Sequence, residues 1–172
     1  NSIALESHGY ALVRELASTG TTAVLLVRRD GEAPSPLSGA GWRPATSGGY
    51  SPAGRIPQRG DTFVVKTYAL GGLEQKAQLG VLQEIRLLKR LEHAYVIRYV
   101  ESWWNGVGPE SGRMTLVMEH ADDGDLRTPR YAAQRAETHL EEILLKRWLR
   151  QMLEGLVYIH GQNVVHRDLK AS

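Results

Sequence analysis

The first part of the chain shows short apolar runs of the kind that form strands. Residues 10–29 contain two such runs on either side of the polar sequence Ser-Thr-Gly-Thr-Thr, and residues 63–68 form a further run rich in valine. Runs of β-branched and aromatic residues that are bounded by turn residues are typical of β-strands. We therefore predict two strands joined by a turn over residues 10–29, and a third strand over residues 63–68.

The pattern changes to a helical period over residues 73–91. Apolar residues recur there every three or four positions and would line one side of a helix: Val81, Leu82, Ile85, Leu88 and Leu91. Two more apolar runs follow, at residues 96–104 and 114–118, and they are predicted to be strands.

The C-terminal part of the chain has a second helical pattern. Thr138 and Glu141 have the spacing of a capping box, in which each side chain caps a backbone N–H of the first turn. An apolar stripe follows: Leu145, Leu149, Met152, Leu156 and Ile159. Gly161 stands where a left-handed C-cap is wanted. The order of elements, with strands, a helix, strands and then helices, predicts an α+β fold.

Residues 31–60 interrupt this pattern. Sixteen of these thirty residues are glycine, proline or serine, so the segment has too little apolar surface to build a core. We predict a disordered insertion, which a fold can tolerate because the cost of closing a loop grows only logarithmically with its length.

Composition narrows the classes of function. The chain has 172 residues, which suit one ordinary domain, and a net charge of +2, which gives no basic stripe for nucleic acid. Without cysteine it has no disulfide and no thiolate metal site, and the histidines lack metal-ligand spacing. No apolar run reaches the roughly 18 residues of a membrane span, and no signal peptide is visible. We therefore expect a cytoplasmic or nuclear protein.

Lys66 and Glu84 stand where a lone charge would be unfavourable. Glu84 falls among the apolar positions of the predicted helix at 73–91, and Lys66 follows two valines in the strand at 63–68. Burying a carboxylate is costly unless it is paired. An ion pair between strand and helix would satisfy both charges and aim the ammonium at phosphate oxygens. The alternative is that each long side chain reaches the surface separately.

A charged motif, His-Arg-Asp-Leu-Lys, occupies residues 166–170 after the last predicted helix and two valines. The carboxylate of Asp168 can accept, or orient, the proton of an attacking hydroxyl. The ammonium of Lys170 can neutralise charge on a transferring phosphoryl group. The alternative for so short a motif is a charged surface turn, but its position after a helix, a glycine and a valine pair favours the catalytic interpretation.

With these motifs in this order, the chain resembles a eukaryotic-type protein kinase catalytic domain. Within that superfamily, Tyr-Val-Glu-Ser-Trp at 99–103 and the hinge-like sequence at 116–126 are similar to the NIMA-related (Nek) serine/threonine kinases. The resemblance implies an N-lobe with an antiparallel sheet and one long helix over residues 1–118. A hinge would follow at 119–124, and residues 125–172 would begin a helical C-lobe that stops in the catalytic loop.

The resemblance also assigns roles to matching residues. Lys66 would hold the α- and β-phosphates of ATP, with Glu84 as its helix partner. Asp168 would be the catalytic base, and Lys170 would favour serine or threonine over tyrosine in a protein substrate. Met118 would be the gatekeeper beside adenine. Further contacts to adenine and ribose would come from three residues: Glu119, Ala121 and Asp125.

The turn after the first strand departs from the family pattern. When Val24 is aligned with the valine of the phosphate-covering Gly-x-Gly-x-x-Gly-x-Val loop, none of the glycine positions holds glycine. They hold Ala17, Thr19 and Thr22, and Leu16 precedes them. Side chains there keep the backbone from approaching phosphate closely, although threonine hydroxyls could still donate hydrogen bonds. The segment is either a weakened ATP-binding loop or an ordinary Ser/Thr turn.

The family's Mg²⁺ ligands are expected beyond the end of this chain. Its metal-binding asparagine would fall at position 173, and its Asp-Phe-Gly motif later still. We therefore expect the isolated chain to be inactive, although the family uses ATP and Mg²⁺. The alternative, motivated by the missing glycines, is a pseudokinase or scaffold module with weak or no ATP binding.

Overall fold

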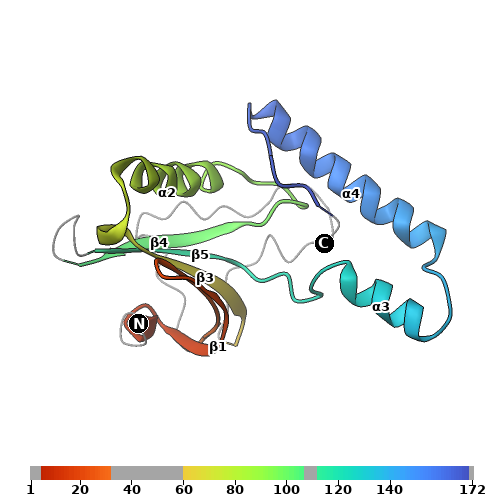
Figure 1. Cartoon of the computed structure of the whole chain (residues 1–172), viewed down its shortest axis with the longest axis horizontal. Coiled ribbons are helices and arrows are strands. Elements are labelled where there is room, and N and C mark those ends of the chain that lie inside the picture. The colour runs from red at the N-terminus through yellow and green to blue at the C-terminus, as the bar shows by residue number, and fades with distance from the viewer. Residues whose placement is uncertain (1–4, 32–59, 107–111, 171–172) are drawn as a thin grey trace. The chain divides into compact units, whose positions relative to one another are not determined.

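The computed structural model describes residues 5–31, 60–106 and 112–170 (Figure 1). Most of the predicted insertion, residues 32–59, lies outside the described residues, so its disorder stays a prediction. The chain divides into two compact units: Asn1–Glu92 with Ile97–His120, and His93–Val96 with Ala121–Ser172.

The first unit is built on a five-stranded antiparallel sheet with strand order β1-β2-β3-β5-β4. Each predicted strand is present, with ends that differ by a few residues. The predicted α+β fold class, with an antiparallel sheet, one long helix and then further helices, is confirmed. The strands are β1 (Tyr10–Ser18), β2 (Thr22–Arg29), β3 (Thr62–Ala69), β4 (Tyr99–Asn105) and β5 (Arg113–Glu119).

The long helix α2 spans Gln75–Leu88, slightly less than the predicted 73–91. A short 3₁₀ helix, η1 (Leu70–Gly72), links it to β3. After α2 the chain leaves the helical ladder, and the N–H of Leu91 donates to the carbonyl of Leu88 at 3.2 Å. The helix therefore ends in a tight turn before the chain reaches β4.

The sheet buries side chains on both faces, because successive residues of a strand point to opposite sides. Helix α2 covers one face, which we call the helix face (Figure 1). The cluster on the helix face contains Tyr68, Leu70, Val81, Ile85 and Leu116. The other face, which we call the far face, carries a separate cluster: Leu5, Tyr10, Leu25, Val27, Phe63, Val65 and Val117.

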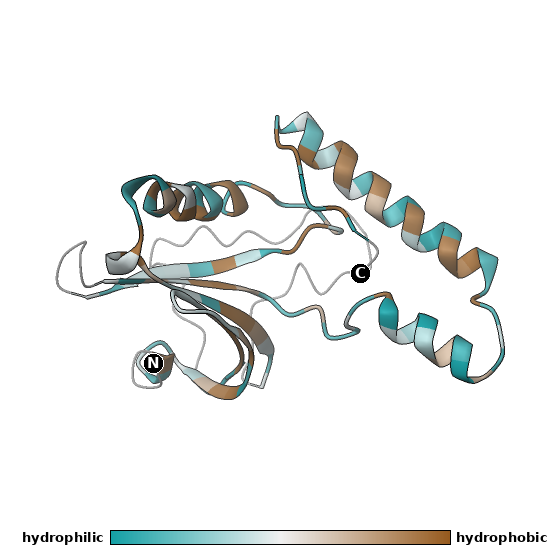
Figure 2. Cartoon of the chain, viewed as in Figure 1, coloured by the Kyte–Doolittle hydropathy of each residue, from teal (hydrophilic) through white to brown (hydrophobic). Residues whose placement is uncertain are grey.

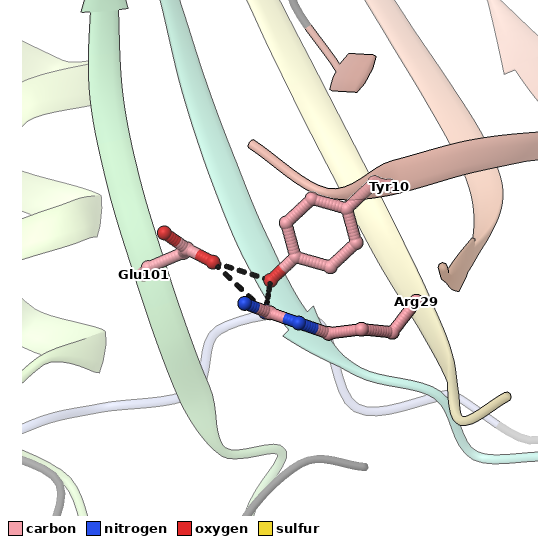
Figure 3. Close-up of polar contacts among 3 residues, drawn as sticks. All are labelled: Tyr10, Arg29 and Glu101. Atoms are coloured by element: carbon pink, nitrogen blue, oxygen red, sulfur yellow. Dashed lines mark hydrogen bonds and ion pairs between the residues drawn. The ribbon is translucent and has the colours of Figure 1, made fainter. Parts of the chain in front are cut away.

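A buried polar cluster ties three strands together on the far face (Figure 3). Nη1 of Arg29 donates to the hydroxyl oxygen of Tyr10 at 2.6 Å and to Oε1 of Glu101 at 3.3 Å. The Tyr10 hydroxyl in turn donates to Glu101. Burial, and then the negative charge of Glu101, raises the pKa of Tyr10. The cluster joins β1 and β2 to β4 across the width of the sheet.

The second unit contains α3 (Arg127–Arg135) and α4 (Glu142–Gly161). The predicted capping box at the start of α4 is wrong. The N-cap residue Glu141 makes no side-chain cap hydrogen bond. The hydroxyl of Thr138 instead donates to the carbonyl of Ala133 in α3, at 3.3 Å.

The left-handed residue after α4 is also not the predicted one. Gly161 is the last residue of the helix, and Asn163 has the positive φ, at 59°. The N–H of Asn163 donates to the carbonyl of His160, and the N–H of Val164 donates to the carbonyl of Ile159, both at 2.9 Å. These two bonds form a Schellman motif, in which asparagine tolerates the left-handed backbone.

Residues 93–96, between α2 and β4, pack on α4 within the second unit. A Cβ at Gly155 would lie 2.9 Å from the carbonyl oxygen of Tyr95, so a glycine is needed for this approach. The ring of His93 stacks on the ring of Tyr158 with centroids 4.8 Å apart. The segment is therefore fixed to α4 by backbone packing and by ring stacking.

Helix α4 carries both hydrophobic and hydrophilic residues along its length, and its ribbon alternates between brown and teal in Figure 2. Ile159 is buried, whereas Leu149 is 54% exposed and Val157 is 73% exposed. The described helices include none with the length and apolar character that crossing a membrane requires.

Candidate functional site

An ion pair joins β3 to α2. Nζ of Lys66 lies 3.0 Å from Oε1 of Glu84, so the predicted pairing is confirmed and the alternative of two separate surface charges is wrong. Both side chains stay partly exposed, 29% for Lys66 and 41% for Glu84. Because a lysine ammonium has three donors, one carboxylate leaves it the capacity to bind an anion.

The strand register gathers several predicted site residues on the helix face. Val24 of β2 and Leu116 of β5 lie directly opposite Lys66. Ala17 of β1 lies opposite Val24, and Met118 follows Leu116 by two residues on β5. Directly opposed residues, and residues two apart on one strand, share a face. The helix face therefore presents an ammonium among apolar side chains.

Tyr68 also contacts this pair, although the sequence analysis assigned it no role. Its ring centroid lies 5.0 Å from Nζ of Lys66, and Tyr68 is 4% exposed. Burial, and then the negative charge of Glu84, raises the pKa of Tyr68. The signal in the sequence was its spacing of two from Lys66, which puts both side chains on one face of a strand.

The hairpin tip between β1 and β2, residues 19–22, closes on itself. The N–H of Thr19 donates to the carbonyl of Thr22 at 2.7 Å, and the N–H of Thr22 donates to the hydroxyl of Thr19 at 3.1 Å. This is the bonding of an ordinary Ser/Thr turn, and it occupies two of the four amides at the tip, those of Thr19 and Thr22. Leu16 lies at a register irregularity just before Ala17 and is 39% exposed.

Glu119, the first predicted hinge residue, is held to the start of β4 by Arg98. The N–H of Arg98 donates to Oε1 of Glu119, and the N–H of Glu119 donates to the carbonyl of Arg98, both at 3.0 Å. The guanidinium Nε lies 3.8 Å from Oε2 of Glu119. The next residue, His120, shares a hydrogen bond of 3.0 Å with the hydroxyl of Thr62. The end of β5 is thus anchored on both sides.

Two further predicted nucleotide contacts, Ala121 and Asp125, are exposed residues of the second unit. Oδ1 of Asp125 accepts from the N–H of Arg127 at 3.0 Å, and Oδ2 accepts from its Nε at 2.7 Å. The Arg127 guanidinium holds the pKa of Asp125 below its ordinary value. Asp125 therefore serves the start of α3, and a role toward ribose stays a prediction.

The predicted catalytic residues near the end of α4 form a local pair. Nζ of Lys170 lies 3.1 Å from Oδ2 of Asp168, with both side chains well exposed. The N–H of Asp168 donates to Nδ1 of His166 at 3.3 Å, and Arg167 between them has a left-handed backbone with φ of 64°. The turn thus holds the carboxylate and the ammonium side by side at the surface of the second unit.

The donor groups fit a nucleotide in one respect and not in another. Lys66 offers a positioned cation for phosphate, beside apolar side chains suited to a base. The amides of Thr19 and Thr22 at the hairpin tip, in contrast, are already used within the turn. Over the described ranges of the chain, no group of three or more His, Cys, Asp or Glu residues could hold a metal ion. The described residues therefore offer, at Lys66, a cation that can meet an anion such as a phosphate, and they include no metal-binding cluster of that kind.

Most of the helices and strands described above lie within a match to a known protein family. A family profile described as "Protein kinase domain" matches residues 47–172, which include β3 and everything after it. Strands β1 and β2 precede the match, yet they pair with β3 in the same sheet. The unmatched part lacks the expected glycines and includes residues 31–46 of the Gly/Pro/Ser-rich segment, whereas residues 47–60 of that segment lie within the match.

Several curated kinases are distant relatives. MAP3K epsilon protein kinase 1 of Arabidopsis thaliana is 30% identical over 115 residues, which are 67% of this chain and 8% of that protein. Serine/threonine-protein kinase Nek4 of Mus musculus is 31% identical over 111 residues, which are 64% of this chain and 13% of that protein. Serine/threonine-protein kinase bur1 of Emericella nidulans is 32% identical over 124 residues, which are 69% of this chain and 22% of that protein.

The chain thus spans less than a quarter of the length of each of these relatives, and no single kinase subfamily stands out among them. The family profile, in contrast, covers well over half of the chain, including the strand of Lys66, the helix of Glu84 and the turn of Asp168. On that coverage, the chain belongs to the protein kinase domain family.

Proposed function

We propose that this chain is part of a serine/threonine protein kinase, which transfers the γ-phosphate of ATP to a serine or threonine of a protein substrate. The observation that carries the proposal is the Lys66–Glu84 pair. It places a partly exposed ammonium on the helix face, opposite Val24 and Leu116, with its position fixed by a carboxylate. Phosphoryl transfer depends chiefly on such positioning and on charge stabilisation.

In the proposed reaction each residue acts through a stated atom. Nζ of Lys66 binds phosphate oxygens, and Glu84 keeps it in place. A carboxylate oxygen of Asp168 takes or orients the proton of the substrate hydroxyl, and Nζ of Lys170 offsets negative charge beside it. Bound Mg²⁺ would neutralise the phosphates, with ligands outside the described residues.

We further propose that the first unit is the N-lobe, and that residues from 121 onward begin the C-lobe. Met118, Glu119 and Ala121 would then face adenine, with Asp125 near the ribose. The bonds from Arg98 to Glu119 support this assignment, because they fix the backbone at the end of β5. An adenine ring needs such a fixed edge for its hydrogen bonds.

A Nek-like subfamily is a finer proposal. It rests on the sequences at 99–103 and 116–126 and on the relationship to Nek4. Phosphorylation of peptide libraries by the full-length gene product would test it, since a substrate preference unlike that of Nek kinases would contradict it.

The main test of the proposed function is the Lys66→Met variant of the full-length product. Phosphotransfer to a protein substrate is expected to fall by at least about a hundredfold, because the variant removes the cation that meets the phosphates. Arg28→Met is a matched control, since Arg28 is an exposed cation of the same sheet paired with Asp30. Unchanged phosphotransfer in Lys66→Met would reject the enzyme proposal.

A second candidate function is a pseudokinase or scaffold module with weak or no ATP binding. The closed hairpin tip favours it, because the amides of Thr19 and Thr22 bond within the turn. Calorimetric titration with ATP discriminates between the two. Binding that depends on Lys66 supports the kinase, and absence of binding in the full-length product supports the scaffold.

A further inference from the structure

Tyr68 is placed to control where the Lys66 ammonium lies. The distance of 5.0 Å between Nζ of Lys66 and the ring centroid is within the range of a cation–π contact. The ring itself is fixed, because Tyr68 is 4% exposed and packs in one cluster with Val81 and Ile85 of α2. A fixed ring beside a flexible lysine narrows the positions that the ammonium can take.

The hydroxyl of Tyr68 is the second half of this arrangement. It is buried and lies near Glu84, which acts on it as a charge and as a weak acceptor, but no well-formed hydrogen bond joins the two among the described residues. A buried hydroxyl without a well-formed hydrogen bond is unfavourable unless it gains one in another state. Glu84 is the charged group that acts on it: burial, and then the negative charge of Glu84, raises the pKa of Tyr68, so the hydroxyl is a donor at neutral pH as in any tyrosine and keeps its proton further into the alkaline range. Oε1 of Glu84 accepts from Lys66, and a carboxylate has a second oxygen that can accept from Tyr68.

We propose that Tyr68 is a positioning residue for Lys66. Its ring holds the ammonium from one side, and its hydroxyl donates to Glu84 when the ammonium engages the phosphates of ATP. This inference rests on the proposed function, because it requires that Lys66 bind phosphate. A residue with this role affects how tightly the phosphates of a nucleotide bind and leaves the binding of its adenosine part unchanged.

Two variants separate the ring from the hydroxyl. Tyr68→Phe keeps the ring and loses the hydroxyl, whereas Tyr68→Leu loses both. Affinities for ATP and for adenosine are measured on the full-length product by displacement of a fluorescent nucleotide. ATP affinity is expected to fall about twofold in Tyr68→Phe and about fivefold in Tyr68→Leu, with adenosine affinity unchanged in both. Equal weakening of ATP and adenosine would show a merely structural role and overturn the proposal.

Phe63→Leu is the matched structural control. Phe63 is a buried aromatic residue of the same strand, but it packs in the cluster on the far face. The variant is expected to lower the melting temperature as much as Tyr68→Leu does, and to leave the ratio of ATP to adenosine affinity unchanged. A changed ratio in Phe63→Leu would mean that any loss of core packing produces the effect, which would also overturn the proposal.

A double-variant cycle with Lys66→Met completes the test. If Tyr68 acts through Lys66, then Tyr68→Leu causes no further loss of ATP affinity once Lys66 is absent. An additional fivefold loss in the Lys66→Met background would overturn the proposal. If the wild type binds ATP, and Lys66→Met weakens that binding while Tyr68→Leu does not, the role of Tyr68 alone fails. If the wild type binds neither ATP nor adenosine, the proposed function fails and this inference fails with it.

Discussion

The two charged clusters of the sheet, one on each face, differ in how completely they are enclosed. On the far face, Arg29 is 2% exposed and shares the carboxylate of Glu101 with the hydroxyl of Tyr10. On the helix face, Lys66 is 29% exposed and has one carboxylate oxygen as its hydrogen-bond acceptor. The far-face cluster connects elements 72 positions apart in the sequence, from Arg29 to Glu101, whereas Lys66 and Glu84 are 18 positions apart.

This difference is the reason for assigning the far-face cluster a structural role and for proposing a ligand-binding role for the pair on the helix face. Charges taken out of water must be hydrogen-bonded within the protein, and on the far face Nη1 of Arg29 donates to both Tyr10 and Glu101. The pair on the helix face keeps contact with solvent and has donor capacity left over. An open ion pair can exchange water for a ligand, whereas an enclosed one would first have to break.

The largest effect is expected from removing the enclosed cation. Arg29→Met should lower the free energy of unfolding by about 3 kcal/mol, because it leaves the carboxylate of Glu101 without its buried partner. Denaturant unfolding followed by tryptophan fluorescence measures this loss. Arg150→Met removes the exposed partner of Glu154 on α4 and serves as the control, with an expected change below about 0.5 kcal/mol. Equal losses in the two variants would contradict the comparison.

Alkaline pH should act on the same cluster through Tyr10, and on the other face through Tyr68. Both pKa values are raised in the folded chain. Their contribution to stability is therefore fully present below about pH 10, the pKa of tyrosine in the unfolded chain. Above that pH the unfolded chain loses protons that the folded chain keeps, and the free energy of unfolding falls by up to about 1.4 kcal/mol per pH unit for each residue. Unfolding curves between pH 8 and 11.5 measure how the free energy of unfolding changes with pH. If that dependence were the same in a double variant with Tyr10→Phe and Tyr68→Phe, these two tyrosines would not be its cause.

Tyr10→Phe should have a smaller effect than Arg29→Met. The variant removes one donor to Glu101 and one acceptor from Arg29, but it leaves those two charges paired with each other. We expect a loss of about 1–2 kcal/mol, as for other buried hydrogen bonds to charged groups. Thermal unfolding compares the two variants, and a loss as large as that of Arg29→Met would show that the hydroxyl, and not the cation, completes the cluster.

The smallest effect on stability is expected from the open pair. Lys66→Met should change the free energy of unfolding by less than about 1 kcal/mol, because both partners are partly exposed and screened by solvent. The same variant is expected to lower phosphotransfer by at least about a hundredfold. Denaturant unfolding and an activity assay on one preparation measure both, and a large loss of stability would mean that the two faces do not differ in kind.

The strands and the long helix of the first unit could be predicted because their apolar periods are strong and local. The Lys66–Glu84 pair could be predicted because a carboxylate stood inside an apolar arc. The far-face cluster could not, since Arg29 ends a strand and reads there as a surface residue. Its burial depends on Glu101, which is 72 positions away in the sequence.

Local signals in the second unit were less reliable because other groups competed for them. Thr138 and Glu141 have capping-box spacing, but the Thr138 hydroxyl bonds to the preceding helix. Gly161 suits a left-handed position, yet α4 continues through it and Asn163 takes that conformation. Which residue caps a helix depends on where the helix begins or ends. A sequence pattern locates those ends only to within a residue or two.

The approach of Tyr95 to Gly155 also limits how this polypeptide can be divided for expression. Residues 93–96 belong to the second unit, although both of their neighbours along the chain belong to the first. A product cut after His120 would keep His93 but lose Tyr158, its stacking partner, along with the glycine that receives the Tyr95 carbonyl. No single cut point therefore yields both units intact, and they should be produced as one polypeptide.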